Sequence, residues 1–157
     1  MKGLRKVDLA ALYSAYADAV YGYLAFKLQD RQLVEDLVQE TFLAAQEGLD
    51  RLETVHSPKA WLLAIAHNKM VDFLRRRPPD LPLIWEGAAV GDSSALFVEE
   101  ALKQLADLER TIVYGLYVEG FTYRELAEML SLPEGTVKSK AHNARRHLYR
   151  WLQEGER

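Results

Sequence analysis

The sequence contains no cysteine among its 157 residues. This absence excludes a disulfide framework and any metal site built on thiolates. No apolar run approaches the roughly 18 residues that a membrane-spanning helix needs, so we expect no insertion into a membrane. The first residues, MKGLRKVDLAALY, also lack the apolar region and cleavage site of a secretory signal. We therefore expect a cytoplasmic protein.

The patterns that usually carry enzymatic chemistry are missing as well. The four histidines show no spacing typical of metal ligands, and His142 and His147 do not share a helix face. We find no glycine-rich phosphate loop and no nucleophile placed beside a base. The sequence therefore predicts a protein that is not an enzyme and that has no metal site and no cofactor.

The charge of the chain is unevenly distributed. Twenty Lys and Arg stand against 23 Asp and Glu, which gives a net charge of −3. Residues 136–152 nevertheless hold five Lys or Arg and no acid, and a second basic run lies at residues 75–77. Affinity for phosphates scales with the number of neutralising cations. The net charge therefore argues against indiscriminate nucleic-acid binding, while the distribution points to these two basic segments.

Apolar residues recur at helical spacing along nearly the whole chain, and no stretch shows a credible strand pattern. The spacing predicts an all-α fold. Its second helix should begin after an N-cap at Asp30, and its third should run from about Pro58 to Arg77. The residues expected to face inward are Leu9, Leu12, Tyr16, Val20 and Tyr23 in the first helix, Val34, Leu37, Val38, Thr41, Phe42 and Ala45 in the second, and Leu62, Ile65, Ala66, Met70, Phe73 and Leu74 in the third.

The helical pattern stops at PPDLPLIWEGAAVGDSS, residues 78–94, which holds three prolines and two glycines. Proline removes a backbone donor and ends the preceding helix, so we expect a flexible linker here. The chain is therefore predicted to form two small helical domains, residues 1–77 and 95–157. The helices expected in the second domain span about 95–105, 108–119, 122–130 and 134–152, with Gly120 closing the second of these.

The last two of these helices have the pattern of a helix-turn-helix. TYRE, residues 122–125, is a capping box that begins a short helix, and a tight turn at residues 131–133 follows it. The last helix has a basic outer face, and such a helix enters the major groove of DNA. The alternative, a solvated basic face without a ligand, is disfavoured by the lack of acids there. Its expected inner face is Val137, Ala141, Ala144, Leu148 and Leu152.

Two faces of the first domain are also distinctive. Asp36 and Glu40 lie four residues apart on the second helix, a like-charge repulsion of a few tenths of a kcal/mol. This face suggests a cationic partner, although an ordinary solvated face would show the same spacing. On the third helix, the amide of Asn68 could read a base edge. Trp61 could stack on an unpaired base or serve as a core residue.

A family resemblance joins these features. The segment ALKQLADLERTIVYGLYVEGFTYRELAEMLSLPEGTVKSKAHNARRHL resembles region 4 of bacterial σ factors of the extracytoplasmic-function (ECF) group, in the σ70 family. The GTVKS element and the following Ala-Arg pair are its strongest part. DLVQETFLAA resembles the region that grips core RNA polymerase, and SPKAWLLAIAHNKMVDFLRRR the region that opens and reads the −10 element. The three segments follow one another along the chain in the same order as in the family.

The resemblance implies a σ2-like helical bundle and a σ4-like helix-turn-helix domain. It implies core RNA polymerase as a partner, through the β′ clamp helices and the β flap, together with promoter DNA and, as a further candidate, an anti-σ factor. The loop at residues 53–57 resembles the family loop that captures a flipped base. The implied contacts are Asp36, Gln39, Glu40 and Leu43 with core polymerase; Trp61, Asn68, Asp72, Arg75 and Arg76 with the −10 element; and Thr136, Lys138, Ser139, Lys140, His142, Arg145 and Arg146 with the −35 element.

Two other functions remain as alternatives. A σ-like decoy would bind an anti-σ factor without reaching DNA, but we expect a decoy to lose the basic residues of its last helix, which are present here. A stand-alone helix-turn-helix repressor would leave the acidic DLVQE face without a role. We therefore predict a σ factor that binds core polymerase and directs promoter-specific initiation.

Overall fold

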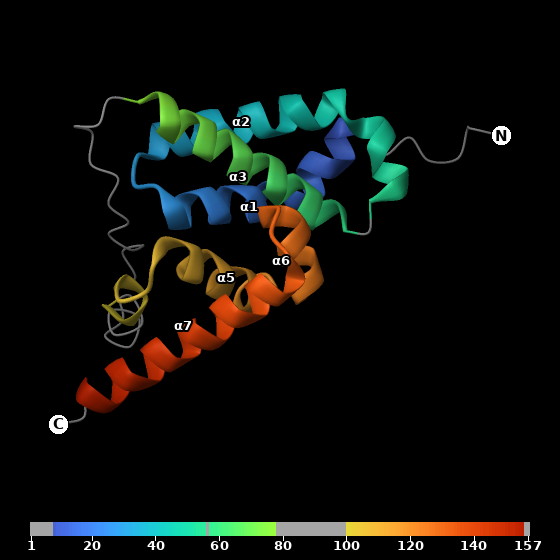
Figure 1. Cartoon of the computed structure of the whole chain (residues 1–157). Helices are drawn as coiled ribbons and strands as arrows, with labels where there is room; N and C mark the ends of the chain where they lie inside the picture. Colours follow the sequence, from blue (N-terminus) through green and yellow to red (C-terminus); the bar gives the residue numbers. More distant parts are fainter. Residues whose placement is uncertain (1–7, 56, 78–99, 156–157) are drawn as a thin grey trace. The chain divides into compact units, whose positions relative to one another are not determined.

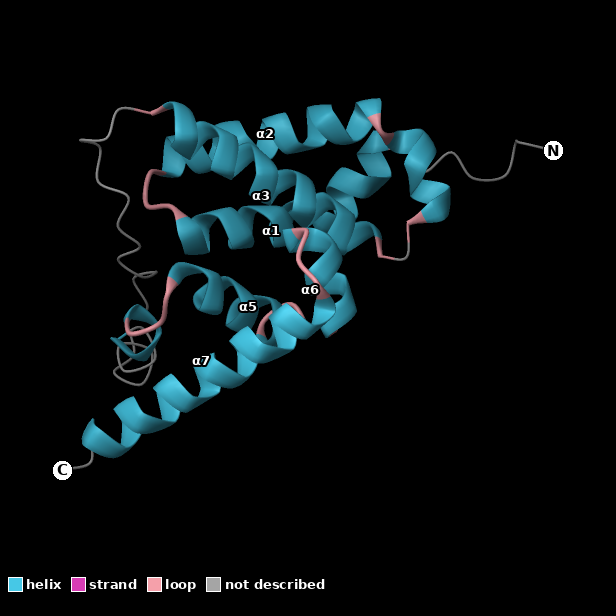
Figure 2. Ribbon diagram, viewed as in Figure 1, coloured by secondary structure: helices cyan, strands magenta, loops and turns pink. Residues whose placement is uncertain are grey.

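The computed structural model describes residues 8–55, 57–77 and 100–155, and every regular element in this part of the chain is helical (Figures 1 and 2). The prediction of an all-α fold is confirmed. The chain divides into two compact units, Met1–Trp85 and Glu86–Arg157. The predicted linker at residues 78–94 lies outside the described residues, so its flexibility stays a prediction.

The first unit consists of α1 (Leu9–Lys27), α2 (Arg31–Glu47), the short 3-10 helix η1 (Leu49–Thr54) and α3 (Pro58–Arg76). Side-chain caps fix where the three long helices begin, since each cap accepts one of the unpaired N–H groups of a first turn. Asp8, Asp30 and Ser57 accept from the residue three positions on, at 2.7, 3.2 and 3.2 Å. The predicted starts at Asp30 and Pro58 are confirmed.

The core of the first unit lies where α1, α2 and α3 pack against one another (Figure 1). The predicted stripe of α2 is fully buried, whereas Leu9 and Tyr16 of α1 are only half-buried. The predicted stripe of α3 is partly wrong. Leu63 was not in it and is completely buried, and Phe73 was in it but is 36% exposed. Phe73 is exposed because it lies near the end of α3, on a groove beside α2 rather than in the core.

The second unit contains α5 (Asp107–Tyr117), α6 (Tyr123–Leu130) and α7 (Glu134–Gly155), and residues 100–103 are also helical. Gly120 has a φ of +69° beyond α5, and this left-handed backbone is the reason for glycine there. The predicted capping box is confirmed. The Thr122 hydroxyl accepts from the Glu125 N–H at 3.1 Å, and the Glu125 carboxylate accepts from the Thr122 N–H at 3.0 Å.

The apolar face of α7 packs against α5 and α6. Val137, Ala141 and Ala144 are buried as predicted, and Leu148 is half-buried. Leu152 is 38% exposed, contrary to the prediction. Leu152 belongs to the last turns of α7, which extend beyond α5 (Figure 1).

Close packing between α5 and α6 depends on Gly115. A Cβ added to Gly115 would lie 2.4 Å from Cδ2 of Leu126, whose side chain is fully buried. Gly115→Ala is therefore expected to lower the free energy of unfolding of the second unit by about 1–3 kcal/mol, the usual cost of overpacking.

Urea unfolding followed by far-UV circular dichroism measures this effect. Gly135→Ala is the matched control, because a Cβ at this helical position meets nothing within 4 Å. Alanine there should leave stability unchanged or raise it slightly. Equal midpoints for the two variants would contradict the packing argument.

Candidate functional site

The buried face of α7 fixes which of its residues face solvent. With Val137, Ala141 and Ala144 turned inward, the polar side chains lie around the rest of the helix. None of the seven residues predicted for the −35 element belongs to this buried face, and together they spread around the rest of the helix. Lys138, Ser139, His142, Arg145 and Arg146 are exposed, and Thr136 and Lys140 are half-buried.

The early turns of α7 are only loosely tied to other groups. Lys138 Nζ lies 3.5 Å from the carboxylate of Glu134 and 5.9 Å from the ring centroid of Tyr123. An exposed ion pair of this kind contributes about 0.2–1 kcal/mol. The Ser139 hydroxyl donates to the Gly135 carbonyl at 3.0 Å. Little free energy would be lost if these two side chains turned to a ligand.

Arg145 is held differently. Its Nε donates to the phenol oxygen of Tyr117 at 2.9 Å, and its Nη2 donates to that of Tyr123 at 2.8 Å. These bonds, first that to Tyr117 and then that to Tyr123, raise the pKa of Arg145 above its ordinary value. An arginine is always charged in a protein, and the two bonds hold this guanidinium in place. Neither tyrosine was predicted to take part, because they lie 28 and 22 residues from Arg145 and outside any helical spacing.

Two further contacts stiffen the same unit. His147 Nδ1 of α7 lies 3.0 Å from a carboxylate oxygen of Glu109 of α5, which is only 7% exposed. The Tyr114 hydroxyl donates to Glu119 at 3.2 Å. Burial, together with the Glu119 carboxylate, raises the pKa of Tyr114 well above its ordinary value, so its hydroxyl stays a donor. No ligand role was predicted for His147, and its contact here ties α7 to α5.

In the first unit, α2 presents the predicted acidic face to solvent. Asp36, Gln39, Glu40 and Leu43 are all exposed, and the Leu43 side chain reaches 61%. Asp36 accepts a hydrogen bond from Gln32 Nε2 at 3.0 Å, one turn away. Leu43 is thus a large apolar side chain exposed on an otherwise polar and acidic face.

The residues on the outer face of α3 that were predicted to contact the −10 element differ in how exposed they are. Asn68, Asp72, Arg75 and Arg76 are exposed. Trp61 is half-buried, and its ring lies against Gly48, where a Cβ would meet Trp61 Cζ2 at 3.0 Å. The interpretation of Trp61 as a packing residue is thereby favoured over that of a free stacking platform.

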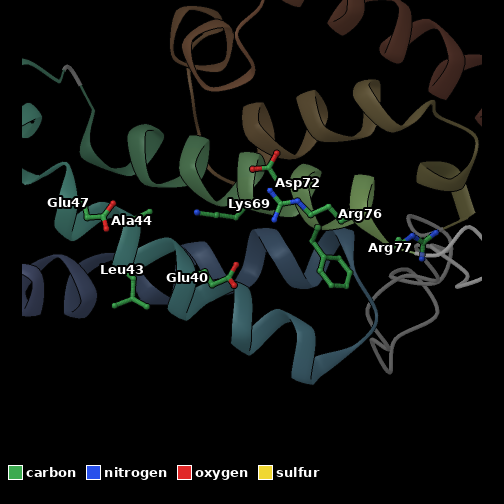
Figure 3. A pocket seen from close by; sticks show the side chains of 9 residues that line it. Glu40, Leu43, Ala44, Glu47, Lys69, Asp72, Arg76 and Arg77 are labelled. Carbon is green, nitrogen blue, oxygen red and sulfur yellow. The ribbon is translucent and has the colours of Figure 1, made fainter.

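A groove lies between α2 and α3, with a volume of about 630 Å³ (Figure 3). It brings together residues predicted for two different partners. Glu40 and Leu43 of α2 were predicted to contact core polymerase, and Asp72 and Arg76 of α3 the −10 element. Carboxylates dominate its α2 side, whereas its α3 side carries three cations. The other lining residues are Ala44, Glu47, Lys69, Phe73 and Arg77.

Within the described ranges, we find no group of three or more His, Asp or Glu side chains that could hold a metal ion. In that same part of the chain, none of the helices has both the length and the apolar character that crossing a bilayer requires.

Comparison with known families accounts for both units. The family model described as Sigma-70 region 2 matches residues 12–78, and that described as Sigma-70, region 4, matches residues 98–148. The chain is 31% identical over 160 residues to the ECF RNA polymerase sigma factor SigL of Mycobacterium tuberculosis (strain ATCC 25618 / H37Rv), covering 93% of this chain and 89% of SigL. It is 25% identical over 178 residues to SigW of Bacillus subtilis (strain 168), covering 98% and 95%.

Solved structures show the same similarity. The sigma factor RpoE of Bartonella quintana, in complex with the anti-sigma factor NepR, is 25% identical with a TM-score of 0.76, covering 93% of this chain and 97% of RpoE. CnrH, in complex with the cytosolic domain of CnrY, is also 25% identical, with a TM-score of 0.65 and coverage of 93% and 88%.

Proposed function

Because this chain belongs to the ECF group of bacterial RNA polymerase σ factors, we propose that it binds core RNA polymerase in the cytoplasm and directs it to a class of promoters. The observation that carries the proposal is the charge of α7, a helix with five Lys or Arg over residues 136–152 in a chain of net charge −3. Low net charge limits binding of the free protein to bulk DNA. Promoter selection is then a property of the complex between this chain and core polymerase.

On the promoter, α7 enters the major groove of the −35 element. Lys138, Ser139 and His142 lie on its early turns and contact base edges, which distinguish one base pair from another. Lys140 and Arg146 contact phosphates, which position the helix but carry no sequence information. Arg145 also contacts a phosphate. Thr136 lies at the start of the same surface.

The first unit binds polymerase and single-stranded DNA. The acidic face of α2, which includes Asp36, Gln39, Glu40 and Leu43, docks on the β′ clamp helices, while the second unit contacts the β flap. Asn68, Asp72, Arg75 and Arg76 of α3 face the −10 element, and Trp61 supports this surface. The segment at residues 53–57, which begins within η1 rather than as the expected loop, captures an unpaired base. The chemistry throughout is binding rather than covalent catalysis.

A regulatory partner is also proposed. RpoE was solved with the anti-sigma factor NepR, and this chain shares its fold over most of its length. We propose that an anti-σ factor binds this chain and keeps it from polymerase.

The test is selection of DNA by the complex. Core polymerase and the full chain are mixed with a random duplex library, and the retained DNA is sequenced. We expect enrichment of one bipartite motif that core polymerase alone does not enrich. Stable core binding without any enriched motif would favour the decoy function instead.

The division of roles on α7 predicts two kinds of defect. Lys138→Ala should lose about 1–3 kcal/mol of discrimination at particular −35 positions. Arg146→Ala should weaken binding to all −35 variants alike and lower the salt dependence, with a change in slope of about 1. Binding of the holoenzyme to a panel of −35 variants at several salt concentrations measures both. Identical profiles for the two substitutions would contradict the assignment.

A further inference from the structure

Three helices of the second unit contribute to one cluster of hydrogen-bond donors. Tyr117 ends α5, Tyr123 begins α6, and Arg145 lies in the middle of α7. Both phenol oxygens accept an N–H of the guanidinium, at 2.9 and 2.8 Å. Arg145 thus joins Tyr117 and Tyr123 at the exposed surface of the second unit.

The cluster has more donors than it uses. A guanidinium carries five N–H groups, and Arg145 uses two of them for the tyrosines. Each phenol oxygen already accepts from Arg145, so its own O–H is directed elsewhere. Among the described residues, no acceptor is found for these two O–H groups or for the remaining N–H groups of Arg145.

The surroundings favour an anion. Tyr117 is 63% exposed and Arg145 is exposed as well, whereas Tyr123 is half-buried, so the unused donors of Tyr117 and Arg145 are the more open to a ligand. Lys138 adds a second cation, 5.9 Å above the Tyr123 ring. The neighbouring acid, Glu134, lies against Lys138 at 3.5 Å. Oxygens with a negative charge are the acceptors that such a group of O–H and N–H donors binds best.

We infer that Tyr117, Tyr123 and Arg145 form one composite site for a single phosphodiester of duplex DNA. The inference rests on the proposed function and adds to it Tyr117, a residue of α5 that lies outside the helix-turn-helix. Free arginine side chains lose rotamer entropy when they bind, and the two phenols hold the Arg145 side chain in place beforehand. The same two phenols keep the guanidinium away from the base edges, so the contact of Arg145 with DNA does not depend on the base sequence.

The experiment measures how each tyrosine is coupled to one phosphate. Holoenzyme is assembled from core polymerase and the full chain, and its affinity is measured on a duplex from the selected promoters. Single phosphates of the −35 element are replaced in turn by neutral methylphosphonates. Tyr117→Phe and Tyr123→Phe each remove one oxygen and nothing else. Tyr149→Phe is the matched control, since Tyr149 is an exposed tyrosine of α7 whose hydroxyl, among the residues that the structure describes, is bonded to Gln153 alone.

We expect wild type to lose about tenfold in affinity at one phosphate position, the loss typical of a hydrogen bond to a charged group. Each Phe variant should lose about three- to tenfold on unmodified DNA and show little further loss when that phosphate is neutral. Tyr149→Phe should behave as wild type throughout.

Phe variants with wild-type affinity, or with the same loss on both duplexes, would show that the tyrosines only support the fold and would overturn the inference. A wild-type holoenzyme that does not bind the duplex at all would instead overturn the proposed function. Circular dichroism and core binding of each variant confirm that its fold is intact.

Discussion

Glu40→Arg is expected to abolish binding of the chain to core RNA polymerase, with a loss of at least a hundredfold in affinity. Glu40 is exposed on α2 and borders the groove beside Leu43. If this face meets a cationic surface, the substitution removes a favourable charge pair and places like charges together, a change of several kcal/mol. Asp36→Arg, on the same face, should have the same effect.

The measurement is a pull-down with core polymerase, followed by titration of the labelled chain. Asp18→Arg is the matched control, because it makes the same charge reversal at an exposed position of α1. Far-UV circular dichroism should show unchanged helicity in all variants, since these side chains point to solvent. If a folded Glu40→Arg protein kept wild-type affinity for core polymerase, α2 would not be part of the polymerase interface.

Asn68→Ala is expected to reduce promoter opening by a factor of about ten to a hundred, the loss of a base contact worth about 1–3 kcal/mol. Asn68 is exposed in the middle of α3, where asparagine is a poor helix former. Its neighbour His67 is fixed by a hydrogen bond of 2.8 Å to Tyr23, which is fully buried in α1. The backbone that carries Asn68 is thus held firmly by the core.

Permanganate footprinting of the −10 element measures this opening. Binding to core polymerase and −35 recognition should stay at wild-type levels. On a template with a pre-melted bubble, the defect should shrink but persist as a lost base preference. Wild-type opening with unaltered −10 preference would mean that Asn68 is a solvated residue and that base reading belongs to the segment at residues 53–57.

The helix starts were predictable because their signals are local. Asp30, Ser57 with Pro58, and the Thr122–Glu125 pair each satisfy donors within three residues of themselves, so the sequence alone specifies them. The outward faces of α2 and α7 follow from their buried stripes in the same way. Whether those faces bind polymerase and DNA stays a prediction.

The features that could not be predicted depend on packing between helices. Phe73 lies at the groove beside α2 and Leu152 in the last turns of α7, and apolar spacing alone does not reveal that either residue is exposed. The groove between α2 and α3 exists only once the two helices are side by side. The bonds from Arg145 to Tyr117 and Tyr123 join three helices, and no local pattern indicates which exposed tyrosines a guanidinium will meet.

The central claim is that this chain gives core polymerase its choice of promoter. Sequencing the 5′ ends of transcripts from a random promoter library, made by core polymerase with and without the chain, tests it most directly. We predict start sites that appear only with the chain, at a fixed distance from one shared bipartite motif, and that are lost with Glu40→Arg. Identical start sites with and without the chain, under conditions where it binds core polymerase, would contradict the account.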